Sequence, residues 1–369
     1  MTTLSEQVQA LAPQMQSWRR DLHQFAESGW LEFRTATRVA DALHKLGYQL
    51  QLGREVINAE ARMGLPNAEV LKQQETRALQ QGALPQWLPY FSGGFCGVVA
   101  TLETGRPGPV MGFRVDMDAL DLNESQAPDH LPQREGFVSC NPGMMHACGH
   151  DGHTTIGLAL ASVLMAMKSQ LSGTIKLIFQ PAEEGVRGAK AMVEAGVVDD
   201  VDLFTAIHLG TGVPAGELVC GSDSFLATTK LDVHFTGVGA HAGGRPEEGR
   251  NALLAAAQAT LGLHGLPQHS GGVARVNVGV LQAGTGRNVV ADTDSVVDRK
   301  AQAAGSEDAT YMMERVKQRG GQATYAIFGC DLAAGHHNAR FDFDESVMGK
   351  AVQTLATLAL NQAQFGGGR

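Results

Sequence analysis

The sequence contains little charge and no paired cysteines. Only 18% of its 369 residues are Asp, Glu, Lys or Arg, which is below the usual quarter of a globular protein. The 5 cysteines are scattered and include no Cys-x-x-Cys pair. This spacing excludes both a disulfide scaffold and a zinc ribbon. We therefore expect a reduced, cytoplasmic chain.

Long hydrophobic runs and basic tracts are also missing. No stretch reaches the roughly 18 uncharged apolar residues that span a membrane. The N-terminus lacks the basic start and apolar run of a signal peptide. The net charge of −9 has no basic tract behind it, so a nucleic-acid partner is not expected. We predict an enzyme-like protein that binds neither membranes nor nucleic acids.

Apolar residues make up 43% of the chain, and they fall into short runs separated by helical stretches. Buried strands are predicted at 110–115, 174–180, 203–209 and 323–329. Helices are predicted at 6–24, 35–46, 153–168 and 188–195. Continuous apolar strands separated by helices are typical of an α/β fold with a doubly wound, mostly parallel sheet. Residues 53–94 form a polar, helix-prone excursion that adds nothing to this sheet.

A second pattern begins near residue 225. Leu231, Val233 and Phe235 alternate with polar neighbours, as in a strand with one wet face. A helix at 251–264 and strands at 274–282 and 288–296 are expected to follow. This β-α-β-β pattern predicts an inserted α+β domain. The predicted boundaries are therefore 1–224, 225–297 and 298–369, with the first and third segments forming one domain.

The insertion is expected to be incomplete. Another helix and strand, on the order of 20 residues plus connections, would complete the half-sandwich. Instead the chain runs directly into Asp298-Arg299-Lys300. We expect a missing segment near Val297–Asp298.

The strongest chemical signal is the run MHACGHDGHT at 145–154. It combines Cys148 with His146, His150, Asp151 and His153. Thiolate and imidazole ligands at this spacing suit zinc or another divalent transition metal. The alternative is a His-rich loop that opens a helix, because Asp and Gly are ordinary residues at helix starts.

Further polar residues follow the ends of the other predicted strands. They are Asp116, Asp118, Glu183, Glu184, His208, His336 and His337. Seen alone, the paired Glu residues would be a solvated loop and His208 a core histidine. In open parallel sheets, however, ligands gather beyond the carboxyl ends of the strands. We therefore expect these side chains to meet at one edge.

The resulting set has enough ligands for two divalent ions. The predicted metal ligands are Cys148, His150, Glu184, His208 and His337, although the sequence leaves His336 open as an alternative to His337. Asp118 is available to hold an imidazole. Two ions ~3.5–4 Å apart can acidify a water and polarise a carbonyl. Glu183 is then the spare carboxylate that moves a proton to a leaving amine. This chemistry is amide hydrolysis.

Seven motifs carry a resemblance to a known family: RRDLH, RVDMDAL, MHACGHDGH, LIFQPAEEG, AIHLG, GVGAHAG and GHHNARFDFDE. Their order and types resemble the aminoacylase/carboxypeptidase family of dinuclear metallohydrolases (clan MH). The branch that hydrolyses aminobenzoyl-glutamate and indole-acetyl-amino acids is the most similar. The excursion at 53–94 also resembles that branch. The motifs extend from about residue 18 to 360 and so cover nearly the whole chain.

The resemblance implies further roles. It implies that the insertion is a ferredoxin-like lid and dimerisation domain, and that His241 reaches a partner subunit's site. It places Asn288 near the substrate and matches Arg275 to an arginine that pairs with a substrate carboxylate. A solvated strand-end arginine is the alternative for Arg275. The implied substrate is p-aminobenzoyl-glutamate, the implied cofactors are two Mn²⁺ or Zn²⁺ ions per subunit, and the implied partner is a homologous B subunit or a second copy.

Three alternatives stay open. The run Gly210-Thr-Gly-Val-Pro-Ala215 matches a dinucleotide fingerprint, but Pro214 lies where the helix of that motif begins and no acidic residue ends a second strand about 20 residues later. A non-catalytic subunit is the second alternative, although such a protein has no chemical need for all five ligands and Glu183. The third is an enzyme that acts on other N-acyl or N-aroyl amino acids.

Overall fold

The computed structural model describes residues 3–222, 225, 232–266, 276, 278, 280–284, 287–291, 295–298 and 306–362. The chain divides into two compact units. Unit 1 comprises Met1–Asp223 and Asp308–Arg369, and unit 2 comprises Ser224–Glu307. Unit 2 is therefore inserted between two segments of unit 1.

A seven-stranded sheet forms the centre of unit 1, in the order β1-β2-β4-β3-β5-β12-β6. Its four middle strands are β4 (Thr174–Gln180), β3 (Val110–Asp116), β5 (Leu203–Leu209) and β12 (Gln322–Phe328). They are parallel to one another and coincide with the four strands predicted from the sequence. The α/β fold with a mostly parallel sheet is therefore confirmed.

Three strands that the sequence did not predict complete the sheet. They are β1 (Gln49–Leu52), β2 (Val98–Glu103) and β6 (Leu218–Cys220). All three pair antiparallel with their neighbours. The edge strands β1 and β6 are largely exposed. Strand β1 alternates Gln with Leu, and β6 is apolar but only 3 residues long, so neither has the run of about 4–8 apolar residues typical of a buried strand.

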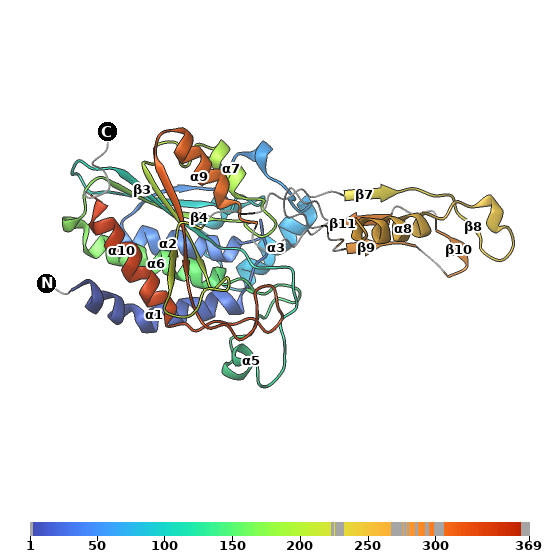
Figure 1. The fold of residues 1–369 in the computed structure, drawn as a ribbon, viewed down its shortest axis with the longest axis horizontal. Helices are drawn as coiled ribbons and strands as arrows, with labels where there is room; N and C mark the ends of the chain where they lie inside the picture. Colours follow the sequence, from blue (N-terminus) through green and yellow to red (C-terminus); the bar gives the residue numbers. More distant parts are fainter. Residues whose placement is uncertain are drawn as a thin grey trace. The chain divides into compact units, whose positions relative to one another are not determined.

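Helices cover both faces of the sheet (Figure 1). One face carries α1 (Leu4–Gln24), α2 (Phe33–Leu46), α6 (His150–Ala166) and α10 (Val347–Leu360). The other face carries α7 (Ala189–Glu194) and α9 (Ala309–Gln318). Nearly every side chain of α6 is buried, because this helix lies between the sheet and the helices α1 and α10. The layers are those of a doubly wound fold.

The excursion predicted at 53–94 lies outside the sheet. It contains η1 (Gly53–Glu55), η2 (Ala59–Ala61), α3 (Ala68–Gln80) and α4 (Leu88–Phe91). The strands that flank it, β1 and β2, pair in register from Gln49 with Thr101 to Leu52 with Val98. The excursion is thus a long connection within an antiparallel strand pair. Two short helices of unit 1 lie elsewhere, α5 (Leu131–Glu135) and η3 (Lys168–Gln170).

Unit 2 contains β7 (Asp232–Phe235), β8 (Ala240–His241), η4 (Pro246–Glu248), α8 (Ala252–His264), β9 (Val280–Gln282), β10 (Val289–Val290) and β11 (Ser295–Asp298). Strands β7, β11 and β9 form an antiparallel sheet, and β8 pairs with β10. The strand predicted at 288–296 is divided between β10 and β11. Val297 and Asp298, near which a missing segment is predicted, are consecutive within β11.

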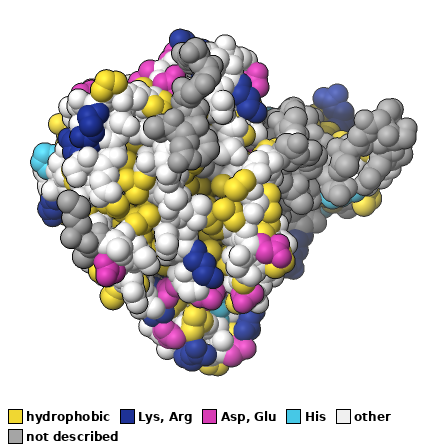
Figure 2. Space-filling view, turned by 60° about the vertical axis from the view of Figure 1, so that its left-hand side comes forward, with side chains coloured by type: hydrophobic (Ala, Val, Ile, Leu, Met, Phe, Trp, Pro, Cys, Tyr) yellow, Lys and Arg dark blue, Asp and Glu magenta, His cyan; other side chains and the backbone are white. Residues whose placement is uncertain are grey.

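None of the described helices is long and apolar enough to cross a membrane. On the face shown in Figure 2, acidic and basic side chains are interspersed around hydrophobic patches. All five cysteines are free thiols, of which Cys140 and Cys220 are exposed.

Candidate metal centre

The predicted metal ligands, Glu183 and Asp118 meet at one edge of the sheet in unit 1. Strands β4, β3, β5 and β12 are adjacent and parallel, so their carboxyl ends lie side by side. The loop after β4 carries Glu183 and Glu184, and Asp118 follows β3. His208 lies at the end of β5, and His337 lies in the loop after β12. This arrangement is the one expected from the strand ends.

The N-terminus of α6 completes this edge. Gly149 precedes the helix with a φ of 89°, a left-handed conformation that glycine adopts without strain. His150 and His153 are three residues apart on the helix and therefore share a face. Their ring centroids are 5.3 Å apart, and both side chains are buried. Cys148 is buried just before the helix begins.

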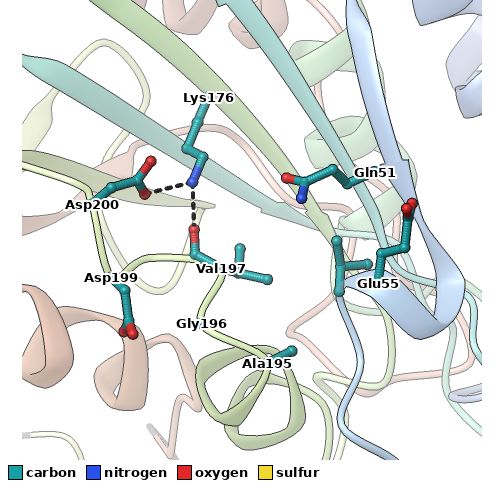
Figure 3. Close-up of a pocket in the computed structure, with 9 residues that line it drawn as sticks. Gln51, Glu55, Lys176, Ala195, Gly196, Val197, Asp199 and Asp200 are labelled. Atoms are coloured by element: carbon teal, nitrogen blue, oxygen red, sulfur yellow. Dashed lines mark hydrogen bonds and ion pairs between the residues drawn. The ribbon is translucent and has the colours of Figure 1, made fainter.

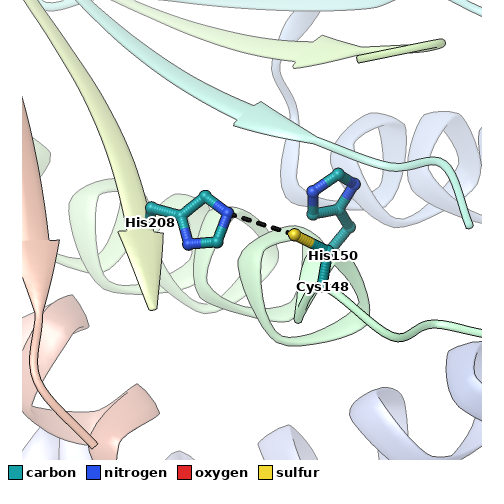
Figure 4. A group of neighbouring side chains, drawn as sticks. All are labelled: Cys148, His150 and His208. Carbon is teal, nitrogen blue, oxygen red and sulfur yellow. Dashed lines mark hydrogen bonds between the residues drawn. The ribbon is translucent and has the colours of Figure 1, made fainter. Parts of the chain in front are cut away.

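Three overlapping groups of potential ligand atoms consist of the predicted ligands and Glu183, and a further group joins Asp116, His150 and His153. The first is Cys148, His150 and His208, whose ligand atoms lie within 4.8 Å of one another. In Figure 4 the Cys148 thiol points toward the His208 ring, and Sγ is 3.5 Å from Nε2. The second group is Cys148, Glu184 and His337, and the third is His150, Glu183 and Glu184. All five predicted ligands and the predicted base are thus brought together.

His150 and His208 both face this cluster with Nε2, because each Nδ1 is hydrogen-bonded to a backbone carbonyl. His150 donates from Nδ1 to the Asp118 carbonyl oxygen at 2.8 Å. His208 donates from Nδ1 to the Leu209 carbonyl oxygen, also at 2.8 Å. These hydrogen bonds occupy each Nδ1 and leave each Nε2 as the ring nitrogen that faces the cluster. A backbone carbonyl on the far nitrogen is the usual support of a metal-binding histidine.

Burial and the neighbouring carboxylates oppose ionisation of the acidic groups in this cluster. Burial raises the pKa of the Cys148 thiol well above its usual range, and Glu184 adds to this. Burial, together with Asp118 and Asp116, raises the pKa of Glu184 to about 7. Glu184 Oε1 and His150 Nε2 are buried without a hydrogen-bond partner. A thiol, a carboxylate and imidazoles with unused buried atoms are the donor set that a divalent cation fits.

The structure distinguishes between His336 and His337. The His336 Nε2 accepts the Thr211 N–H at 3.0 Å, and its ring packs against His208 and Phe341. His337 Nε2 instead lies 3.5 Å from Glu184 Oε1. His337 adopts a φ of 61°, which is rare outside glycine and frequent at functional sites. The geometry therefore favours His337 as the ligand.

Asp118 holds the carboxylate loop in place. Its two carboxylate oxygens accept the N–H groups of Glu183 and Glu184, each at 2.9 Å. The Asp118 carboxylate was expected to hold the His150 imidazole. Instead, His150 Nδ1 is closer to the backbone carbonyl oxygen of Asp118, at 2.8 Å, than to its carboxylate, at 3.4 Å. Ala182 and Val186, on either side of the two glutamates, have φ values of 52° and 60°. This strain is typical of a loop whose shape is set by function.

A further set of buried side chains supports the site, and the contacts within this set were not predicted. His153 Nδ1 lies 2.6 Å from Asp116 Oδ1, and His153 Nε2 accepts the Leu209 N–H at 3.0 Å. Arg114 donates to the other Asp116 oxygen at 2.8 Å. The signal was present in the sequence, since Asp116 lies two residues before Asp118 and His153 lies three after His150. Their contact with each other could not be seen in the sequence.

The motif RRDLH supplies a second buried network next to α6. Arg19 Nε lies 3.0 Å from Asp151 Oδ2, and His23 Nδ1 lies 2.8 Å from the same oxygen. His23 Nε2 lies 2.9 Å from Glu124 Oε1. Burial alone lowers the pKa of His23, but the hydrogen bonds with Asp151 and Glu124 outweigh it and raise the pKa to about 9. This network anchors the start of α6 to α1.

Two predicted site residues lie together in unit 2. His241 belongs to the two-residue strand β8, rather than to the loop that its glycine neighbours suggested, and it pairs with Val289. Asn288 immediately precedes Val289, and its carbonyl oxygen accepts the Ala242 N–H at 3.0 Å. The His241 Nδ1 accepts the N–H groups of Gly243 and Gly244, which leaves Nε2 as the donor. Arg275 lies outside the described residues.

Two other features do not carry the chemistry. The Gly210–Ala215 run is followed by strand β6 and not by a helix, so the dinucleotide interpretation is wrong.

A cavity of about 250 Å³ lies near the start of β4 and beside the loop that precedes β5 (Figure 3). There Lys176 donates to the Val197 carbonyl and to Asp200. This cavity is at the amino end of the parallel strands, opposite the ligand cluster.

Comparison with known proteins shows similarity over nearly the whole chain. Residues 112–361 match the model of Peptidase family M20/M25/M40. The A subunit of the p-aminobenzoyl-glutamate hydrolase of Escherichia coli (strain K12) is 56% identical over 429 aligned residues, which cover 98% of both chains. Indole-3-acetyl-aspartic acid hydrolase of Enterobacter agglomerans is 55% identical with the same coverage.

Two solved structures are similar to this chain over nearly their whole length. The aminobenzoyl-glutamate utilization protein from Klebsiella pneumoniae has 50% identity and a TM-score of 0.77, with 98% of both chains covered. The Bacillus subtilis YXEP protein, a dinuclear metal binding peptidase, has 22% identity and a TM-score of 0.58, with 95% of this chain and 98% of that chain covered. The second similarity concerns the fold alone.

Proposed function

This chain belongs to peptidase family M20/M25/M40, and we propose that it hydrolyses p-aminobenzoyl-glutamate to p-aminobenzoate and glutamate, a step in folate breakdown. The family resemblance expected from the motifs is confirmed, and the chain is an amidohydrolase. The substrate rests on the full-length similarity to the Escherichia coli p-aminobenzoyl-glutamate hydrolase. The observation that carries the reaction is the convergence of the five proposed metal ligands and Glu183 at one sheet edge.

The proposed ligands of two divalent ions, Mn²⁺ or Zn²⁺, are Cys148, His150, Glu184, His208 and His337. When bound, such ions supply a water of lowered pKa and polarise the scissile carbonyl. Asp118 supports this set because it fixes the backbone of Glu184 through one oxygen and the His150 ring through its carbonyl. His150 Nε2 and Glu184 Oε1, which are buried and have no hydrogen-bond partner, support the assignment as metal ligands.

Glu183 is the proposed acid and base. Its carboxylate lies 3.9 Å from His150 Nε2 and is therefore next to the ligand atoms, while Glu184 approaches both Cys148 and His337. Glu183 would take the proton of the attacking water on a carboxylate oxygen and give it to the leaving amine nitrogen. The N–H of Glu183 donates to the Asp118 carboxylate. This hydrogen bond fixes the backbone that carries the Glu183 side chain.

Unit 2 is proposed to act as a lid and dimerisation domain. His241 would donate from Nε2 to the oxygen of the attacked carbonyl in a partner subunit's site. Asn288 would lie near the substrate, and Arg275 would pair with one of its carboxylates. The large exposed apolar side chains of α8 support a role in association, since Leu254 is 63% and Leu261 76% exposed. Apolar exposure of this kind marks interaction surfaces.

The names of two relatives, each the A member of a hydrolase or its homologue, suggest a partner subunit. We propose a homologous B subunit, with a second copy of this chain as the alternative, and we place the assembly in the cytosol. The relatives' alignments span 429 residues whereas this chain has 369. This difference supports a segment absent from this chain, and we place that segment near Val297–Asp298 because the strand and helix pattern of the insertion is incomplete there.

A substrate panel tests the function. Purified protein is incubated with Mn²⁺ or Zn²⁺ and p-aminobenzoyl-glutamate, indole-3-acetyl-aspartate or N-acetyl amino acids, and the products are separated by chromatography. The proposal expects p-aminobenzoyl-glutamate to have the highest kcat/KM. A preference for indole-3-acetyl-aspartate, which the 55% identity to its hydrolase makes the main alternative, would overturn the substrate assignment. Metal-loaded protein that cleaves none of them, with its B subunit present, would indicate a non-catalytic subunit.

A further inference from the structure

We propose that Arg187 receives the side-chain carboxylate of the amino acid that the enzyme releases. This inference rests on the proposed function, because it names the group that would make glutamate or aspartate the preferred leaving amino acid. It assigns a specificity role to a residue in the loop of the metal ligand Glu184.

The side chain of Arg187 is hydrogen-bonded to the backbone of that loop. It lies three residues after Glu184, and its Nε donates to the Glu184 carbonyl oxygen at 2.8 Å. The intervening residues Gly185 and Val186 have φ values of 85° and 60°, so the chain turns sharply back on itself. The guanidinium is consequently held next to the residue that binds metal, and the side chain is half-buried.

Two glycines make the space that the guanidinium occupies. A Cβ added to Gly29 would lie 2.3 Å from Arg187 Nη2, and one added to Gly64 would lie 2.9 Å from Arg187 Cδ. The Gly64 carbonyl oxygen also accepts a long hydrogen bond, 3.4 Å, from Nη1. Any larger residue at either glycine would displace the arginine. The sequence therefore provides a cradle that fixes a cation in one place.

Among the described residues, no carboxylate forms an ion pair with the guanidinium of Arg187. The other arginines near the site are paired, Arg19 with Asp151, Arg77 with Glu27 and Arg114 with Asp116. In the part of the chain that the structure describes, the only hydrogen-bond acceptors of Arg187 are the two backbone carbonyls. A fixed, half-buried guanidinium without an acidic partner suits a ligand carboxylate, which it can bind through two N–H groups.

The surroundings of Arg187 favour the side-chain carboxylate over the α-carboxylate. Every N-acyl amino acid has an α-carboxylate, whereas only glutamate and aspartate carry the second one. Arg187 contacts the excursion between β1 and β2, which lies outside the residues matched by the family model. The excursion is itself anchored there, because Trp30 Nε1 donates to the Met63 carbonyl at 2.8 Å. Arg187 is thus positioned by the connection between β1 and β2 as well as by the Glu184 loop, and we assign it to the carboxylate that not all N-acyl amino acids carry.

The test compares two substrates that differ only in this carboxylate. Metal-loaded wild-type and Arg187→Gln proteins are assayed with p-aminobenzoyl-glutamate and p-aminobenzoyl-glutamine. We expect kcat/KM for the glutamate substrate to fall about 10- to 100-fold in Arg187→Gln, mainly through KM, since a hydrogen bond to a charged group is lost. The glutamine substrate should change less than about twofold. Arg187→Lys should restore part of the glutamate activity because it keeps the charge.

Arg62→Gln is the matched control. Arg62 also holds the excursion through backbone carbonyls, with Nη1 donating to Gly93 at 2.7 Å, but it has no contact with the Glu184 loop among the described residues. Any effect of Arg62→Gln should be equal for the two substrates. An equal loss for both substrates in Arg187→Gln would instead make Arg187 a structural residue, and no loss for either would also overturn the proposal.

Binding of the product glutamate tests the role of Arg187 independently of the hydrolysis reaction. Calorimetric titration should show that Arg187→Gln weakens glutamate binding about 10-fold or more and leaves glutamine binding unchanged. Unchanged glutamate binding would refute the role of Arg187. Wild-type protein that binds glutamate in this Arg187-dependent manner but cleaves no p-aminobenzoyl-glutamate would refute the proposed reaction and leave the carboxylate site standing.

Discussion

The imidazole of His153 is held by the carboxylate of Asp116, with 2.6 Å between Nδ1 and Oδ1. This pair lies behind the ligand cluster. His153 accepts the N–H of Leu209, the residue after His208, and its ring centroid is 4.6 Å from that of His208. The pair therefore sets the position of a proposed ligand without belonging to the ligand set.

Weakening this pair should reduce metal affinity. We expect Asp116→Asn and His153→Gln to lower the affinity about 10- to 100-fold, because outer partners of metal ligands have effects of this size. Metal titration followed by calorimetry measures the change, and circular dichroism checks that the fold is retained. Asp129→Asn, which removes an exposed partner of Arg340, is the control. Affinities equal to wild type in both site variants would contradict the role of the pair.

Metal binding should protect the thiol of Cys148. A thiolate ligand must be deprotonated, and burial raises the pKa of this thiol, so binding of the cation should release a proton. A thiol reagent should modify Cys148 more slowly once Mn²⁺ or Zn²⁺ is present, as read by mass spectrometry of each peptide. The exposed Cys140 reports on the reagent itself. Equal rates at Cys148 with and without metal would exclude it as a ligand.

The buried His23 should make stability fall as the pH rises. Its pKa is raised from 6.5 to about 9 in the folded state, so the folded protein binds the extra proton between these values. Its contribution, on the order of 3 kcal/mol, is fully present below pH 6.5 and is lost as the pH passes 9. Urea unfolding in EDTA should show His23→Gln less stable than wild type at pH 6, with a gap that narrows by pH 9.5. A gap that is constant across this range would mean that His23 is neutral.

His241 should act across a subunit interface. The Nδ1 of His241 is occupied by the N–H groups of Gly243 and Gly244, so its Nε2–H is available to a carbonyl oxygen that gains charge. A donor of this kind is typically worth ~2.7–4 kcal/mol. His241→Ala and Glu183→Ala should each be nearly inactive, and mixing them should restore activity, because some sites then have both residues intact.

The mixing experiment is run without the B subunit, whose equivalent histidine could substitute. Subunit exchange is verified with a tagged chain. Two inactive variants that exchange freely and still recover no activity would show that His241 does not act in trans.

The sequence predicted the parts of the molecule that are governed by local pattern. The four middle strands are continuous apolar runs, and β4 and β5 have the predicted bounds. Because parallel strands end at one edge, the polar residues that flank them could be placed together from the sequence alone. The edge strands β1 and β6 were missed because β1 alternates polar and apolar residues and the apolar run of β6 is only 3 residues long.

Contacts between distant segments could not be predicted. The pair of Asp116 and His153 spans 37 positions, and Arg187 reaches Gly64 across 123. Nothing in local periodicity encodes a hydrogen bond over such a separation. The choice between His336 and His337 was also beyond the sequence, because it depends on the Thr211 N–H that occupies His336.

Metal content and turnover of Glu183→Ala, measured on the same preparation, test the central claim most directly. Glu183 is proposed to move the proton while the five other residues hold the metal. The account predicts the same metal stoichiometry as wild type by elemental analysis, with hydrolysis of p-aminobenzoyl-glutamate reduced by ~10²–10⁴-fold. Loss of metal together with activity would make Glu183 a ligand, and full activity with metal bound would remove it from the reaction altogether.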